Sequence, residues 1–152
     1  MQIGVDEGYE PIQPIHFSHK IHAGDNQIDC KYCHSGARTS VVAGVPSLNV
    51  CMGCHNTISE YEGEEDLANG YTKEFYTKEI KKLYEAVGWD EQKFRYTGTP
   101  KGVQWVRIHK LPDFTYFNHS QHVAVGGLEC QKCHGEVQQM EVVHQHAPLT
   151  MG

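Results

Sequence analysis

The cysteines constrain this chain more than any other feature. All six of them, among 152 residues, stand in C-x-x-C pairs, and a histidine follows each pair directly. C-x-x-C-H is the attachment signature of a c-type haem. Two thiols at this spacing can add across the two vinyl groups of one porphyrin, and the adjacent histidine can then bind the iron. The sequence therefore predicts three covalent haems, attached at Cys30 and Cys33, Cys51 and Cys54, and Cys130 and Cys133, with His34, His55 and His134 as proximal iron ligands.

Two other uses of paired cysteines fit the pattern less well. The 17 residues between Cys33 and Cys51 would suit a zinc ribbon. That interpretation leaves the pair at Cys130 and Cys133 without a second pair, and it does not explain the histidine after every motif. Disulfides within C-x-x-C motifs are mostly redox-active rather than structural. Haem attachment is the interpretation that uses every cysteine.

The composition supports an interior filled by a cofactor. Hydrophobic residues make up 39% of the chain, which also has 15 glycines and 11 histidines, so little apolar side-chain surface is available for a core. We expect a mostly irregular chain with short α-helices that carry the motifs, little β-structure, and packing around covalent haems. The formal net charge of -6 makes nucleic acid an unsuitable partner.

An internal repeat surrounds two of the three motifs. The segment FSHKIHAGDNQIDCKYCH at residues 17–34 aligns without a gap with FNHSQHVAVGGLECQKCH at residues 117–134, an offset of 100 residues. Each copy contains Phe-x-His-x-x-His ahead of its C-x-x-C-H motif, and such repeats reveal the unit of construction. Histidines three residues apart point to nearly the same face of a helix, so they can ligate two neighbouring irons.

The repeat predicts the distal iron ligands. We expect His19 to bind the haem of Cys30 and Cys33, and His22 to bind the haem of Cys51 and Cys54. By the same logic His119 binds the haem of Cys130 and Cys133, and His122 would bind a further haem beyond residue 152. The remaining histidines, which have no repeat partner, are expected to be packing or surface residues: His16, His109, His144 and His146.

Closed irons indicate electron transfer. An iron with two axial imidazoles has no open position for a substrate, so it passes electrons rather than performing bond chemistry. We therefore expect no catalytic residues. Two other functions stay open at this point: a free-standing three-haem electron shuttle, and a multihaem reductase of nitrogen or sulfur oxyanions.

The chain is expected to form one multihaem cytochrome domain over residues 1–152. Two related haem-binding units, 15–56 and 115–152, are joined by a helical insert, 57–114. Within the insert, apolar residues recur at helical spacing over 71–88, with Thr72 as N-cap and Gly88 just past the end. The acidic stretch EYEGEED at residues 60–66 predicts a solvated loop.

Two segments carry a family resemblance. Residues 13–24 (QPIHFSHKIHAG) and 105–135 (WVRIHKLPDFTYFNHSQHVAVGGLECQKCHG) closely resemble the pentahaem cytochrome c of bacterial alternative complex III, a quinol:electron-acceptor oxidoreductase. The Phe-x-His-x-x-His element is also similar to that of class III multihaem cytochromes c. In the first family, the stretch matching residues 148–152 continues into another C-x-x-C-H motif.

The resemblance implies a particular setting. It places the chain on the periplasmic side of the bacterial inner membrane, in a quinol-oxidising respiratory complex. The implied partners are an iron–sulfur protein, a membrane quinol-binding subunit, and a cytochrome c or terminal oxidase as acceptor. The family pattern has five haems and an N-terminal membrane anchor, whereas this sequence has three motifs and no apolar run long enough for an anchor. We therefore expect the chain to be part of a longer one, held at the membrane through partners or a missing anchor.

Overall fold

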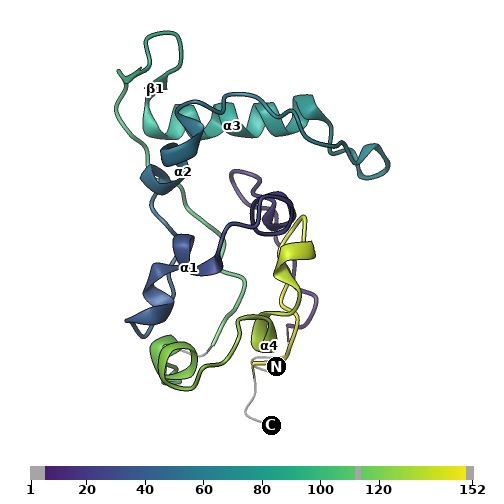
Figure 1. Cartoon of the computed structure of the whole chain (residues 1–152), viewed down its shortest axis with the longest axis vertical. Coiled ribbons are helices and arrows are strands. Elements are labelled where there is room, and N and C mark those ends of the chain that lie inside the picture. Colours follow the sequence, from purple (N-terminus) through teal and green to yellow (C-terminus); the bar gives the residue numbers. More distant parts are fainter. Residues whose placement is uncertain (1–5, 112–113, 150–152) are drawn as a thin grey trace. The chain divides into compact units, whose positions relative to one another are not determined.

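The computed structural model describes residues 6–111 and 114–149 as short helices joined by long irregular segments, with one small hairpin (Figure 1). In chain order the elements are η1 (Lys20–Asp25), α1 (Cys30–Cys33), η2 (Ser35–Arg38), α2 (Leu48–His55), η3 (Leu67–Asn69), α3 (Lys73–Val87), β1 (Trp89–Asp90), β2 (Arg95–Tyr96), η4 (Gln121–Val125), α4 (Gln131–His134) and η5 (Val137–Gln139). The two strands pair antiparallel, with Trp89 opposite Tyr96. The expected fold class, mostly irregular with short helices and little β-structure, is confirmed.

The chain divides into two compact units. The first takes the described residues of 1–12, 17–45 and 106–152, and the second takes 13–16 and 46–105. The first unit therefore unites both copies of the 100-residue repeat, whereas the second motif belongs with the helical insert. The units expected from the sequence, 15–56 and 115–152 joined by the insert 57–114, stay a prediction, because this division follows contacts rather than chain order.

No helix among the described residues is long and apolar enough to cross a membrane.

The second unit has a small apolar core between two helices. Met52 of α2 is 3% exposed and packs with Leu83, Tyr84 and Val87 of α3. These three residues recur at i, i+1 and i+4, so they lie on the same side of the helix. The unit's N-terminal segment is attached through a backbone-to-side-chain hydrogen bond, in which the N–H of His16 donates to Glu79 Oε2 at 2.8 Å.

The long helix α3 has the ends that the sequence predicted. Thr72 is the N-cap, and its hydroxyl accepts a hydrogen bond from the backbone N–H of Phe75 at 3.1 Å. Gly88 ends the helix with φ of +71°, in the left-handed region where glycine carries no steric penalty. A Cβ at this position would also overlap the backbone of Gly98.

The first unit has little apolar core of its own. Among its described residues, Ala37 is the one buried hydrophobic side chain, beside the buried polar residues Ser18 and Gln145. Large apolar side chains of the same unit lie at the surface, including Val42 at 65% and Val125 at 84% exposure. Side chains alone therefore give this unit little burial, which matches the expectation of an interior packed around a large apolar cofactor.

Candidate haem-binding sites

Each C-x-x-C-H motif occupies a short helix that ends at or next to its histidine. Cys30 and Cys33 are the two ends of α1, and Asp29 caps this helix by accepting a hydrogen bond from Lys31 N at 2.7 Å. The other two motifs lie on α2 and α4. One helical turn brings cysteines at i and i+3 to the same face, which is the placement that attachment to one porphyrin requires. The thiols are accessible for this reaction: Cys30, Cys54 and Cys133 are exposed, and Cys33, Cys51 and Cys130 are half-buried.

The candidate iron ligands share one hydrogen-bonding pattern. In five of the seven, ring atom Nδ1 donates to a backbone carbonyl: His22 to Ser18 at 2.8 Å, His34 to Gly44 at 2.6 Å, His55 to Ile58 at 3.0 Å, His119 to Val41 at 2.9 Å and His122 to Asn118 at 2.7 Å. A neutral imidazole that donates from Nδ1 carries its lone pair on Nε2. Metal-binding histidines are commonly oriented in this way.

The rings of His19 and His34 lie at a separation, and with parallel planes, that two axial ligands of one iron can have. Their centres lie 6.4 Å apart and their planes are inclined by only 4°. Two imidazoles bound on opposite sides of one metal, through bonds of about 2 Å, have their ring centres about 6.3 Å apart. The two side chains could therefore hold a haem iron between them, and when bound that haem would supply a one-electron couple between its ferric and ferrous states.

Burial keeps His19 in the form that a metal requires. Desolvation, and then the charges of His34 and His22, lower the pKa of His19 to about 4. Atom Nδ1 of His19 is buried and, among the described residues, has no hydrogen-bond partner. A neutral imidazole at physiological pH offers its lone pair without losing a proton first.

The two copies of the Phe-x-His-x-x-His element have nearly the same local structure. Phe17 stacks on His22 with ring centres 4.2 Å apart and planes at 25°, and Phe117 stacks on His122 at 4.5 Å and 20°. Both phenylalanines also contact the first histidine of their copy edge-on, with ring centres 4.9 Å apart. The shared function of the two phenylalanines is thus to fix both imidazoles of the element.

These histidines lie at π-helical turns. His19 precedes η1, and the N–H of Asn26 bonds to the carbonyl of Ile21, five residues earlier. In the second copy the N–H of Gly126 bonds to the carbonyl of Gln121 in the same way. Such wide turns are rare and occur frequently at functional sites.

His55, the predicted proximal ligand of the second motif, is held by a tyrosine from α3. The hydroxyl of Tyr84 donates to the carbonyl of His55 at 2.5 Å and lies 3.4 Å from the carbonyl of Ile58, which also accepts the His55 ring proton. Burial, and then the charge of Glu91, raise the pKa of Tyr84, so the hydroxyl stays protonated and remains a donor. The sequence indicated Tyr84 only as part of an apolar stripe.

The third motif departs from this pattern. Ring atom Nδ1 of His134 lies 3.1 Å from Nε2 of His109, with the two ring planes at 86°. Among the described residues, the ring of His109 contacts the ring of His134. His119 influences His134 through its charge. Desolvation is the largest cause that lowers the pKa of His134 to about 4, and the charges of His109 and His119 lower it further. His109 was expected to be a packing or surface residue, because it lies ahead of the aligned repeat and the residue 100 positions earlier is Tyr9.

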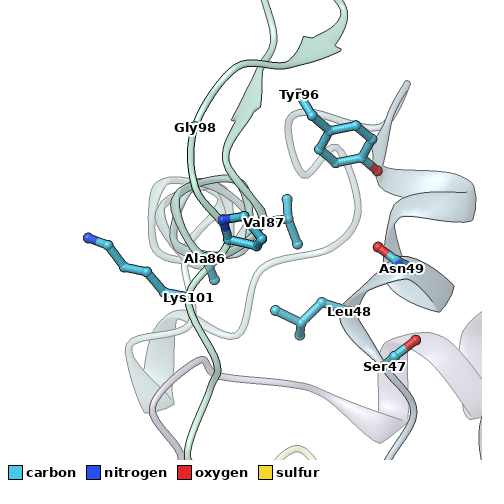
Figure 2. A pocket seen from close by; sticks show the side chains of 9 residues that line it. Ser47, Leu48, Asn49, Ala86, Val87, Tyr96, Gly98 and Lys101 are labelled. Atoms are coloured by element: carbon cyan, nitrogen blue, oxygen red, sulfur yellow. The ribbon is translucent and has the colours of Figure 1, made fainter.

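The pocket in Figure 2 lies in the second unit between α2 and the end of α3. It encloses about 320 Å³, and Leu48 points into it toward Ala86 and Val87. None of the described residues that line it is a cysteine or a histidine, so this pocket is distinct from the candidate iron sites.

Comparison with known proteins establishes the class. The chain belongs to the class III cytochrome c family, whose model matches residues 4–87, more than half of the chain. The match includes the first two C-x-x-C-H motifs and both His19 and His22. The chain is thus a haem c protein whose haems carry electrons, and the zinc interpretation of these two motifs is set aside.

A more specific likeness is to a subunit of a menaquinone reductase. The chain is 30% identical over 122 residues to the menaquinone reductase, multiheme cytochrome c subunit, of Nitratidesulfovibrio vulgaris (strain Hildenborough). The alignment covers 80% of this chain and 45% of that protein, so the chain spans less than half the length of this relative.

Proposed function

We propose that this chain carries electrons through three covalently attached haems whose irons are closed by pairs of histidines. The geometry of His19 and His34 is the observation that supports this most strongly, because the 6.4 Å separation and the 4° inclination match the demands of one iron between two imidazoles. A closed iron binds no substrate, so the chain needs no catalytic residue of its own.

The remaining ligand pairs follow from the repeat. His55 is proposed as the proximal ligand at Cys51 and Cys54, with His22 as its distal partner, a pairing that stays a prediction because the two histidines belong to separate units. At the third motif we keep His119 as the distal ligand of the haem held beside His134. His122, fixed by Phe117 and by the carbonyl of Asn118, is proposed to bind an iron outside this chain's three motifs.

The protein's own groups prepare these sites for electron transfer. The carbonyl of Gly44 holds the Nδ1 proton of His34, and this orients Nε2 toward the iron position. A ligand held in this way does not need to reorient when the iron changes charge. Fixed ligands keep the structural change between oxidised and reduced states small, which favours fast electron exchange.

We further propose that the chain is the multihaem subunit of a quinone-linked membrane complex on the periplasmic side of the inner membrane, of the alternative complex III type. The relative's name specifies menaquinone reductase, and the resemblance of residues 105–135 is to a quinol-oxidising complex; both are quinone-linked. The partners would be a membrane quinone-binding subunit, an iron–sulfur protein, and a cytochrome c or terminal oxidase.

The test is gentle solubilisation of native membranes, followed by purification and intact-mass analysis of the haem-stained band. We expect covalent haem on all three motifs, and co-purification with a membrane protein that exchanges electrons with quinone. Isolation of the chain alone in the soluble fraction would contradict membership of a complex and favour the shuttle. Unmodified thiols at any motif would contradict the three-haem proposal.

A further inference from the structure

The two repeat copies in the first unit contact each other reciprocally. The N–H of Lys20 donates to the carbonyl of Met140 at 2.9 Å, and the N–H of Ser120 donates to the carbonyl of Ser40 at 3.1 Å. Lys20 and Ser120 are matched positions at the 100-residue offset, and so are Ser40 and Met140. The second hydrogen bond is therefore the first one with the two copies exchanged. A contact from i to j that recurs from the copy of i to the copy of j is the mark of a two-fold axis.

Whole elements follow the same rule. The turn before the first motif, η1, lies against η5, which follows the third motif, and η4, before the third motif, lies against η2, which follows the first. The approach of η1 to η5 is close, because a Cβ on Gly24 would overlap the backbone carbonyl of Gln138. The repeat copies thus form a pseudo-two-fold pair within one chain.

Residues near such an axis meet their own counterparts, and here these are the first cysteines of two motifs. A cavity of about 330 Å³ is lined by three matched pairs: Asp29 and Glu129, Cys30 and Cys130, and Lys31 and Gln131. Desolvation, followed by the neighbouring Cys30 thiol, raises the pKa of the Cys130 thiol, which is a sign of their proximity. The first cysteines of the two motifs therefore line one cavity and lie close to each other.

We propose that the haems attached at Cys30 and Cys130 form a close, two-fold-related pair, in contact through the porphyrin edges that these two cysteines hold. This inference rests on the proposed function, that is, on haem attachment at these motifs. Each sulfur becomes bonded to a carbon that is itself attached to a porphyrin ring, so neighbouring sulfurs bring two ring edges together. The first and third haems in the sequence are thereby direct neighbours in the path of electrons.

Electron exchange within the pair is chemically simple. With haems bound at both motifs, one iron would pass from ferrous to ferric while the other passed from ferric to ferrous, and no bond would be made or broken. The path through this unit consequently need not follow the order of the motifs along the chain. An electron that reaches either of these haems has the other within direct reach.

The test is electron paramagnetic resonance of the complete holoprotein during a reductive titration. Low-spin ferric irons in adjacent haems are both paramagnetic, so each perturbs the signal of the other, and reduction of one to the diamagnetic ferrous state removes the perturbation. A His119→Met variant raises the potential of the third haem, which is then reduced first. A His19→Met variant identifies the signal of the first haem by the shift in that signal.

We expect reduction of the third haem to change the line shape of the first haem, and an unchanged line would overturn the pairing. A Gly24→Ala variant, in which the new methyl group pushes η1 away from Gln138, should weaken the coupling while haem content stays the same. Gly102→Ala is the matched control, because a Cβ there meets no atom within 4 Å. If His119→Met does not fold, fully independent haem signals throughout the wild-type titration overturn the pairing. Absence of haem from Cys30 or Cys130 in the intact mass would instead overturn the proposed function.

Discussion

Removing the Tyr84 hydroxyl should loosen the loop that holds His55, the proposed proximal ligand of the second motif. The side chain is 4% exposed, and its hydroxyl makes a short hydrogen bond of 2.5 Å to the carbonyl of His55. In Tyr84→Phe this carbonyl loses its buried donor, a change that costs about 2 kcal/mol. The second contact, 3.4 Å from the carbonyl of Ile58, is too long to add much to stability, but it places the hydroxyl beside the acceptor of the His55 ring proton.

The same substitution should also lower the reduction potential of the second haem. In the wild type, Tyr84 shares the Ile58 carbonyl with the His55 ring proton. Without this competition the carbonyl accepts more strongly from His55 Nδ1, which makes the imidazole a better electron donor and stabilises ferric iron. A structural defect alone would lower stability without this directed shift in potential.

Two measurements on the holoprotein check this reasoning. Thermal unfolding should show a melting temperature lower by roughly 4–8 °C, and a redox titration should show one haem potential shifted downward. Tyr96→Phe is the matched control, because Tyr96 lies in the same unit with its side chain 53% exposed. An upward shift, or equal effects of the two substitutions, would refute the proposed hydrogen-bond chain.

Further substitutions test other parts of the account. His19→Ala should open one iron and add one high-spin signal to the oxidised spectrum; a spectrum that stays entirely low-spin would contradict its assignment as a ligand. His119→Ala should do the same at the third haem, whereas His109→Phe should leave the spin state unchanged, and the opposite outcome would exchange their roles. Met52→Ala should lower the free energy of unfolding by about 2–4 kcal/mol in denaturant titration; a loss below about 1 kcal/mol would mean that the site repacks. Gly88→Ala should cost at least about 1 kcal/mol, because its φ is +71°, and an unchanged denaturation midpoint would contradict this.

The local features of this chain were predictable because short-range chemistry determines them. The helix over 71–88 has a hydroxyl at one end and a glycine at the other, and the structure places its ends at Lys73 and Val87. The family match covers the first two motifs, and the haem attachment predicted there rests on residues only three apart. These local signals do not depend on how the rest of the chain folds.

The long-range features were beyond single-sequence reasoning. The contact between His109 and His134 joins residues 25 positions apart, and His109 lies ahead of the aligned repeat, with a tyrosine 100 positions earlier. The backbone acceptors Gly44 and Val41 carry no side-chain signal at all, since any residue offers a carbonyl. The reciprocal packing of the copies depends on contacts about 80 to 120 residues apart, which the alignment of the copies suggests only once the fold is known.

The most direct test of the central claim is the electron paramagnetic resonance spectrum of the fully oxidised holoprotein. If each attached iron is closed by two histidines, as the parallel rings of His19 and His34 suggest for the first, every ferric signal should be low-spin and insensitive to added cyanide or azide. A substantial high-spin signal that shifts when these ligands are added would reveal an open iron and contradict the account of a protein that only transfers electrons.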